Sequence, residues 1–305
     1  MKRRYSASLL IFLLAAVFLL TACGDKSEVP QGAEEPCETT PLQTPAPKKE
    51  APYPVVKVYF DGLLSDRGYY EKETLFLSPK AIGEFFELSP ETQIFDGSFT
   101  MAFPGFELMG WQDREYMMAD SRYFYTPDQY LDIEGEIYLP EDLVERLFGI
   151  TVDFSPQDLT ASIDNPTLTL LRGGPNYYTT KFESDDLYWL SRIIYTEAGN
   201  QPLEGRIGVG NVVYNRVNSE LFPDTVYDVI FERSPQVVQF DPAATNGIFL
   251  EPDEGSVIAA CMCMEGYNTV GDSMYFLNPR LGDSTWFEKD LEFVVSIGDH
   301  DFYRS

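Results

Sequence analysis

A glutamate set among apolar side chains is the residue of this sequence best placed for acid–base chemistry. Glu197 follows Leu187, Leu190, Ile193 and Ile194, whose spacing predicts one apolar stripe on a helix. On a helical wheel the glutamate falls inside that stripe. Burial there would disfavour the charged carboxylate and raise its pKa, which suits a general acid working near neutral pH. The pattern alone favours a different interpretation, in which the glutamate turns out to solvent at the frayed end of its helix.

The helix that carries Glu197 has clear limits in the sequence. Ser184 is suited to cap its start, and the acids at 185–186 match the positive end of the helix dipole. Gly199 marks its end, and Pro202 begins a second helix.

The remaining C-terminal elements predict an α+β domain that is mostly helical with one short sheet. Gly208 and Gly210 lie inside the second helix, where they lower helix propensity and therefore predict a close contact with another helix. The further elements are a short helix capped by Thr225 and ending near Phe231, a polar loop over 240–250, a helix over about 252–267, and strands over 274–277 and 293–297.

A series of short motifs surrounds Glu197 and continues to the C-terminus. In chain order they are Tyr195-Thr196-Glu197-Ala198-Gly199-Asn200, Pro202-Leu203-Glu204-Gly205, Val212-Val213-Tyr214-Asn215-Arg216-Val217, Phe222-Pro223, Val229-Ile230, Gln239-Phe240, Tyr275-Phe276-Leu277-Asn278-Pro279, Trp286 and Ile297-Gly298-Asp299-His300-Asp301-Phe302. Together these motifs resemble the SleB-type cell wall hydrolases, the spore cortex-lytic family, over about 120 residues. This resemblance, rather than the periodicity, favours an acid role for Glu197.

The resemblance implies a lysozyme-like fold for residues 184–305 and cleavage of peptidoglycan between N-acetylmuramic acid and N-acetylglucosamine. A lytic transglycosylase needs one acid, which also serves as the base, and Glu197 would fill both roles. A hydrolytic mechanism needs a second acid, for which Asp241 is the best candidate. The resemblance also implies substrate-binding residues, although capping turns, closing strands or filling the core are alternative roles for them: Gln239, Phe240, Tyr275, Asn278 and Trp286.

The sequence has few side chains suited to zinc-dependent or cysteine-dependent catalysis. The sequence has one histidine, His300, whereas zinc amidases and endopeptidases use several, so we interpret it as structural. Cys261 and Cys263 lie two apart on a predicted helix, a spacing that rarely forms a disulfide, and Cys261 shares an apolar face with core residues. No metal or cofactor is therefore expected, and carboxylate chemistry on a glycosidic bond remains.

Residues 1–22 have the features of a lipoprotein signal peptide. A basic start precedes an apolar stretch at 9–20, which is too short to span a bilayer comfortably. The tetrapeptide ending in Cys23 resembles a bacterial lipobox, in which that cysteine carries the lipid after cleavage; an ordinary signal peptide is the alternative. The resemblance implies an exported protein, lipid-anchored to the outer face of the cytoplasmic membrane or in the spore envelope.

The charge of the chain limits its partners. It has 49 acidic and 22 basic residues, a formal net charge of −27 that approaches −30 without residues 1–22. Such a protein is repelled by nucleic acid, so a wall substrate would need a shaped, locally neutral cleft. Residues 23–52 are rich in Pro, Glu and Thr and predict a disordered tether. We expect a monomer bound to peptidoglycan glycan strands and to the membrane through its lipid.

A weak internal repeat lies within residues 53–166. Segment 75–88 aligns without gaps on 137–150, and each copy predicts a strand, a Pro-marked turn and a short helix. The region resembles the copper-amine-oxidase N-terminal-like domain, but it has no histidine or cysteine and so lacks the ligands copper prefers. The resemblance implies a small α+β spacer or binding domain, joined by a linker at 167–183.

Two functions from different classes stay open at this point. The first is a membrane-tethered enzyme that cleaves peptidoglycan glycan strands with Glu197 as its acid. The second is a non-catalytic lipoprotein that binds wall glycan or a partner protein. The presence of Glu197 within its motif favours the enzyme.

Overall fold

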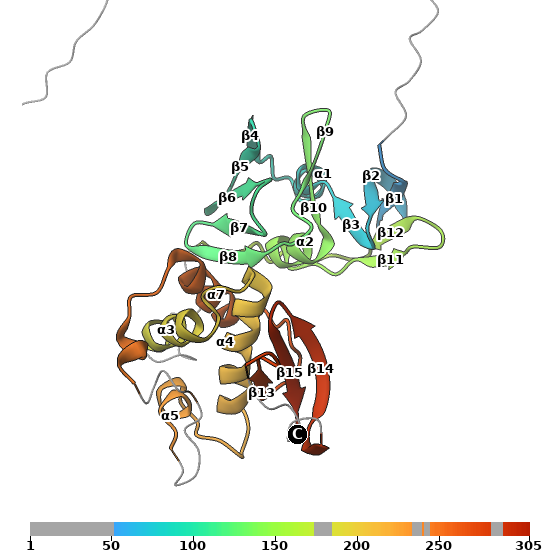
Figure 1. Cartoon of the computed structure of the whole chain (residues 1–305). Coiled ribbons are helices and arrows are strands. Elements are labelled where there is room, and N and C mark those ends of the chain that lie inside the picture. The colour runs from blue at the N-terminus through green and yellow to red at the C-terminus, as the bar shows by residue number, and fades with distance from the viewer. Residues whose placement is uncertain (1–51, 174–184, 234–239, 241–244, 282–288) are drawn as a thin grey trace, which may run out of the picture. The chain divides into compact units, whose positions relative to one another are not determined.

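The structure, a computed structural model, describes residues 52–173, 185–233, 240, 245–281 and 289–305. Residues 50–305 form one compact unit, in which an N-terminal region of sheets precedes a C-terminal region of helices and one small sheet (Figure 1). The predicted signal peptide, Cys23 and nearly all of the predicted tether lie outside the described residues. Among the residues described, none of the helices combines the length and the apolar character needed to cross a membrane.

A seven-stranded sheet organises the N-terminal region, with strand order β11-β12-β1-β2-β3-β10-β9. The strands are β1 (Val55–Phe60), β2 (Leu63–Glu71), β3 (Thr74–Leu77), β9 (Leu131–Ile133), β10 (Glu136–Pro140), β11 (Asp153–Ser155) and β12 (Thr160–Ile163). The pair β1–β12 is parallel and the remaining neighbours are antiparallel. Two helices accompany the sheet, α1 (Pro79–Phe85) and α2 (Glu141–Phe148).

The two predicted repeat segments form the expected strand and helix, as β3–α1 and β10–α2, but the predicted turns are absent: Pro79 begins α1, and Pro140 ends β10 directly before α2. Their strands lie side by side, with Leu77 opposite Leu139. Ser78 caps α1 by accepting a hydrogen bond of 3.1 Å from the Ala81 amide. The copies therefore pair with each other, which the repeat by itself did not indicate.

A second sheet in the N-terminal region is a five-stranded antiparallel meander. Its strands are β4 (Glu91–Phe95), β5 (Ser98–Phe103), β6 (Phe106–Trp111), β7 (Tyr116–Ala119) and β8 (Arg122–Tyr125). Burial alternates along β5, as expected where one face of a strand packs on a core. The Phe103 ring lies 5.7 Å from the Phe148 ring of α2, so the meander and the repeat share their apolar core.

The C-terminal region surrounds the predicted catalytic helix. Its elements are α3 (Asp186–Ala198), α4 (Leu203–Val217), α5 (Val226–Ile230), the 3-10 helix η2 (Asn246–Phe249), α7 (Glu254–Met264), β13 (Tyr275–Leu277), β14 (Glu292–Ile297) and β15 (His300–Arg304). The helices α3, α4, α5 and α7 and the strands β13 and β14 confirm predicted elements, whereas η2 lies where a polar loop was predicted. The central strand β15 was not anticipated; it pairs with both β13 and β14.

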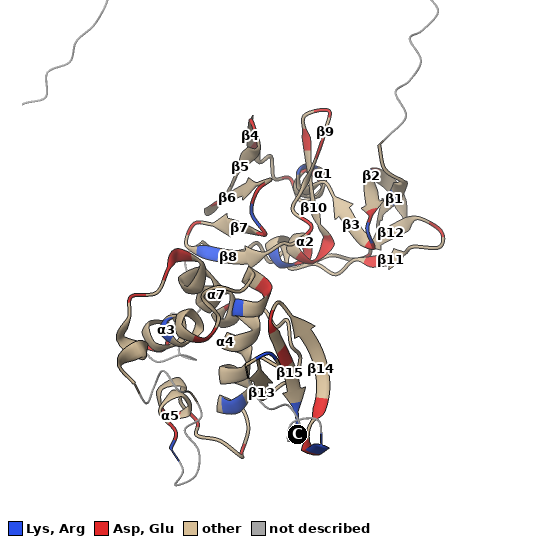
Figure 2. Cartoon of the chain, in the orientation of Figure 1, with Lys and Arg blue, Asp and Glu red and all other residues tan. Residues whose placement is uncertain are grey.

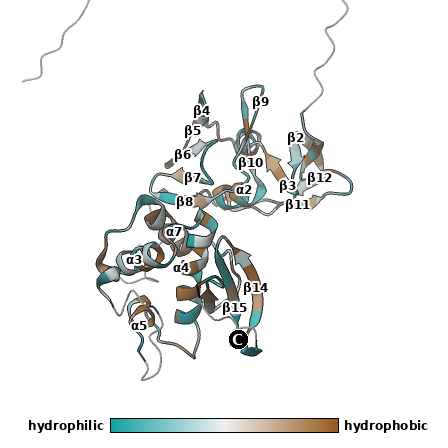
Figure 3. Ribbon diagram, in the orientation of Figure 1, coloured by the Kyte–Doolittle hydropathy of each residue, from teal (hydrophilic) through white to brown (hydrophobic). Residues whose placement is uncertain are grey.

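Two glycines of α4 allow close packing: Gly210 meets another helix, as the sequence predicted, whereas Gly208 meets the strand β15 instead. A Cβ atom added to Gly208 would lie 2.9 Å from the Phe302 ring, and one added to Gly210 would lie 2.6 Å from Cys263 Sγ. Apolar residues run along α4, α7 and β15, whose inner faces form the core (Figure 3). Cys261 is also buried, so the core role predicted for it is confirmed.

Two boundaries differ from the predictions. Asp185 occupies the N-cap position of α3, and Ser184 lies outside the described residues. The first residues of the predicted linker at 167–183 pack on α2: the Thr169 and Leu171 amides donate hydrogen bonds of 2.9 and 2.8 Å to its carbonyls. Apolar side chains at 168–171 pack on the core, which explains why this stretch belongs to the N-terminal region.

Candidate active site

Glu197 lies in the last turn of α3 and is half-buried. The residues around it in the sequence, Ile193, Ile194 and Ala198, have no exposed surface. The apolar stripe therefore belongs to the core, and Glu197 lies at the border of that core. This position is intermediate between the two that the sequence allowed, which were full burial in the stripe and exposure to solvent. The Glu197 side chain therefore borders the apolar core while part of it stays accessible.

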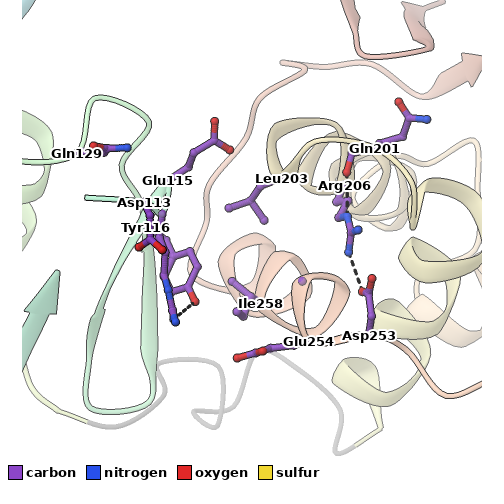
Figure 4. Close-up of a pocket in the computed structure, with 12 residues that line it drawn as sticks. Asp113, Glu115, Tyr116, Gln129, Gln201, Leu203, Arg206, Asp253, Glu254 and Ile258 are labelled. Carbon is purple, nitrogen blue, oxygen red and sulfur yellow. Dashed lines mark hydrogen bonds and ion pairs between the residues drawn. The ribbon is translucent and has the colours of Figure 1, made fainter. Parts of the chain in front are cut away.

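The loop after Glu197 is held by one arginine of α4. Arg206 donates from Nε to the Gln201 carbonyl at 3.0 Å and from Nη2 to the Gly199 carbonyl. Its Nη1 makes an ion pair of 2.7 Å with Asp253, drawn as a dashed line in Figure 4. The guanidinium thus lies at the carboxyl end of α3, where the helix dipole favours a cation.

A second contact fixes the same loop against the sheet. Gln201 Oε1 accepts a hydrogen bond of 2.8 Å from the Asp299 amide, in the turn between β14 and β15. The Asp299 carboxylate in turn accepts 2.9 Å from Arg280. Asn278, two residues earlier, accepts 3.0 Å from the Arg280 amide. The loop after Glu197 and the loop after β13 are therefore joined through a chain of hydrogen bonds.

A buried arginine of α4, Arg216, contacts β13 and the residue before it. Arg216 is only 4% exposed and donates from Nε to the Met274 carbonyl at 2.7 Å. Its guanidinium carbon lies 5.0 to 5.5 Å from three ring centroids: Phe222, Phe240 and Tyr275. Burial lowers the pKa of Arg216 to about 10, which still leaves it charged at neutral pH. Aromatic faces stabilise such a cation by cation–π attraction.

A polar groove of about 700 Å3 borders the loop after Glu197. One wall comes from α4 and α7 and includes Arg206 and Glu254; the other comes from the β6–β7 connection and includes Asp113 and Glu115 (Figure 4). Acidic residues are spread over the elements of both regions and outnumber basic ones (Figure 2). Among the described residues, no group of three or more His, Cys, Asp or Glu is arranged to hold a metal ion.

Part of the C-terminal region is similar to known proteins. Residues 200–303 match the model of the Cell Wall Hydrolase family. The chain is 35% identical over 123 residues to the spore cortex-lytic enzyme of Oceanobacillus iheyensis, covering 40% of this chain and 43% of that one. It is 32% identical over 121 residues to the spore cortex-lytic enzyme of Bacillus subtilis, covering 40% and 38%. The chain thus spans about two fifths of the length of these curated relatives.

Two solved structures also resemble part of this chain. The catalytic domain of the germination-specific lytic transglycosylase SleB from Bacillus anthracis is 30% identical, with a TM-score of 0.37, covering 41% of this chain and 98% of that chain. The catalytic domain of the Bacillus cereus SleB protein is 26% identical, also with a TM-score of 0.37, covering 43% and 99%.

The structure describes three of the five predicted substrate-binding residues. Tyr275 is half-buried on β13 and lies beside Arg216. Asn278 caps the turn after that strand, which matches its alternative, structural role. Phe240 is 2% exposed and packs 6.3 Å from the Phe276 ring, so in this structure it fills the core and leaves almost no face for a sugar. The other two, Gln239 and Trp286, and the candidate second acid Asp241, lie outside the described residues.

His300 has the structural position that the sequence analysis gave it. It is buried, its ring lies 5.2 Å from the Phe276 ring, and burial lowers its pKa despite the nearby charges of Asp299 and Asp301. A histidine held neutral in this way packs as an aromatic residue.

Sequence reasoning missed Arg206 and the Gln201–Asp299 contact. The loop that these residues hold carries no basic side chain of its own, so its carbonyls needed a donor from elsewhere in the chain. An arginine one turn into the next helix was a possible signal. The partners of that arginine on α7 are about fifty residues away in sequence, however, and no local pattern reveals them.

Proposed function

We propose that this protein cleaves peptidoglycan glycan strands between N-acetylmuramic acid and N-acetylglucosamine, as a lytic transglycosylase with Glu197 as its acid and base. The observation that carries the proposal is a half-buried glutamate at the end of α3, directly before residues that match the Cell Wall Hydrolase family. A lysozyme-like fold of residues 184–305 is part of the same proposal.

The reaction needs one carboxyl group that changes protonation state twice. The protonated Glu197 gives its proton to the glycosidic oxygen as the bond from that oxygen to the muramic anomeric carbon breaks. The muramic C6 hydroxyl oxygen then bonds to the anomeric carbon, and its proton returns to the carboxylate. The products are an anhydromuramic end and a free N-acetylglucosamine hydroxyl, no water is consumed, and the acid is regenerated.

Substrate recognition in this proposal uses residues near β13. Tyr275 and Asn278, with Gln239 and Trp286, would bind N-acetyl, hydroxyl and ring groups of the glycan. Phe240 would act indirectly, since its ring packs beside Arg216 and supports the strand that carries Tyr275. The half-buried Tyr275 and Asn278 are consistent with this division.

The setting of the enzyme is also a proposal. Cys23 would carry a lipid, residues 23–52 would act as a tether, and residues 53–166 would be a copper-amine-oxidase N-terminal-like spacer or binding domain. The curated relatives are spore cortex-lytic enzymes, which supports a substrate in the spore cortex or the cell wall. A monomer would suffice, because Glu197 and its supporting residues come from one chain.

The decisive experiment digests purified peptidoglycan and spore cortex with the full chain, its Glu197→Gln variant and the surface control Glu220→Gln. Mass spectrometry should find anhydromuramic products with wild type and control, and none with Glu197→Gln. Reducing muramic ends would indicate hydrolysis and a second acid. Folded wild-type protein that releases nothing from either substrate would overturn the enzyme and favour a non-catalytic wall-binding lipoprotein.

A further inference from the structure

The end of α3 lacks the groups that usually stabilise a helix terminus. Its last turn has no basic residue, and Gly199 follows with ordinary helical backbone angles. The last carbonyls of a helix have no partner within the helix and carry partial negative charge. Glu197 lies in this turn, so any fraying there would displace its carboxyl group.

Arg206 supplies the missing donors from the neighbouring helix. Its planar guanidinium donates hydrogen bonds to the carbonyls of both Gly199 and Gln201, which lie two residues apart in the loop. The Arg206 side chain is 14% exposed. An arginine fork can hold two acceptors at once in fixed geometry, which a lysine ammonium cannot do as rigidly.

The far side of the guanidinium is anchored as well. Nη1 of Arg206 donates to Asp253 at 2.7 Å and to Ser256 Oγ at 3.1 Å. Asp253 is the N-cap of α7 and accepts 2.9 Å from the Ser256 amide. Burial works to raise the pKa of Asp253, but hydrogen bonds from Ser256 and Arg206 outweigh it and hold that pKa below its ordinary value. The ion pair is therefore intact at neutral pH.

The opposite side of the loop is held by close packing. A Cβ atom added to Gly298, whose φ is +61°, would lie 2.4 Å from the Gln201 side chain. The Gln201 side chain also bonds the Asp299 amide. The loop thus has one rigid support on the sheet, and Arg206 provides the other on α4 and α7.

We propose that Arg206 is a positioning residue that fixes the carboxyl group of Glu197 by bonding the loop carbonyls directly after it. This inference rests on the proposed function. Removing the guanidinium frees the Gly199 carbonyl and lets the last turn of α3 fray. A displacement of about 1 Å at a reacting group costs on the order of 10²-fold in rate.

The test compares Arg206→Ala, Arg206→Lys and Arg304→Ala in the full chain, with anhydromuramic product as the kinetic readout. Arg304 pairs with two carboxylates, Glu292 and Asp272, so its loss removes ion pairs elsewhere in the same region. We expect Arg206→Ala to lower kcat by about 10- to 100-fold with KM within about twofold of wild type. Arg206→Lys should recover part of that loss, and Arg304→Ala should match wild type. A lower melting temperature with unchanged kcat would overturn the proposal.

Hydrogen exchange of the amides at 193–201, measured under conditions where every variant is folded, provides a second readout. Faster exchange there in Arg206→Ala, but not in Arg304→Ala, supports positioning; equal exchange overturns it. If wild type makes no product, the proposed function fails and hydrogen exchange alone decides the role of Arg206. If Arg206→Ala does not fold, Asp253→Asn is the substitute variant, because it removes the carboxylate that pairs with Arg206. We expect the same lower kcat and the same faster exchange at 193–201 in that variant.

Discussion

Arg122 on β8 and Glu265 directly after α7 form a two-pronged ion pair, with N–O distances of 3.1 and 2.8 Å. The Glu265 side chain is 1% exposed and the Arg122 side chain 13%. Arg122 also donates 3.1 Å to the Arg172 carbonyl. Because α7 packs against α3, this ion pair connects the five-stranded meander, through α7, to α3, the helix that contains Glu197.

Loss of one partner of this pair should be costly. In Glu265→Ala the mostly buried Arg122 charge loses its counterion, and we expect the free energy of unfolding to fall by about 3 kcal/mol. Urea denaturation measures this difference. Glu254→Ala, which removes an exposed carboxylate at the other end of α7, is the matched control and should change stability by less than about 0.5 kcal/mol. Equal effects of the two substitutions would contradict a stabilising role for the ion pair.

Gly210 should tolerate no larger side chain. A methyl group there would lie 2.6 Å from Cys263 Sγ and 2.9 Å from Ile194 Cδ1, so Gly210→Ala forces α3, α4 and α7 apart. We expect a loss of about 1–3 kcal/mol of stability, measured by thermal denaturation. The control is Gly205→Ala in the same helix, where the nearest atom lies at 3.4 Å. This control gains helix propensity and should be neutral or slightly stabilising.

Cys261 and Cys263 should be unreactive in the folded protein. Both are buried, and burial raises the pKa of the Cys263 thiol, so little thiolate is present or accessible. In a chain carrying Cys23→Ser and Cys37→Ser, we expect no reaction with a thiol reagent under native conditions and about two thiols per chain in urea. Rapid labelling of the native form would show that α7 opens readily.

His300 should make stability depend on pH in a defined window. Burial lowers its folded-state pKa below the ordinary value of 6.5, so the folded protein holds it neutral while the unfolded chain takes up a proton. The contribution of neutral His300 to the free energy of unfolding is fully present above pH 6.5. It declines as the pH falls through 6.5 toward the lower folded-state pKa. Urea denaturation between pH 7.5 and 5 should show a larger loss for wild type than for His300→Gln. If the free energy of unfolding changed with pH equally in wild type and His300→Gln, the result would contradict a contribution from His300.

Local patterns in the sequence were sufficient for much of the secondary structure. The apolar stripe, the stop at Gly199 and the start at Pro202 predicted α3 and α4, since periodicity and helix-end residues act over a few positions. The repeat predicted both strand–helix units of the N-terminal region. The motif around Glu197 likewise singled out the candidate acid without any knowledge of the fold.

Contacts between distant segments could not be read in the same way. The meander over 91–125 and the central strand β15 were missed because strand pairing depends on partners across the sheet. Phe240, predicted from its motif to meet a sugar, instead packs on Arg216, because burial is decided by which segments close over a side chain.

The sequence by itself thus determined the candidate acid, the helices around it and the strongly acidic character of the chain. Only the tertiary structure decided that Glu197 is half-buried and that Arg206 holds the loop behind it. The physical reason is the reach of the interactions. Helix propensity and capping act within a few residues, whereas Arg206 meets Asp253 from 47 positions away and Gln201 meets Asp299 from 98.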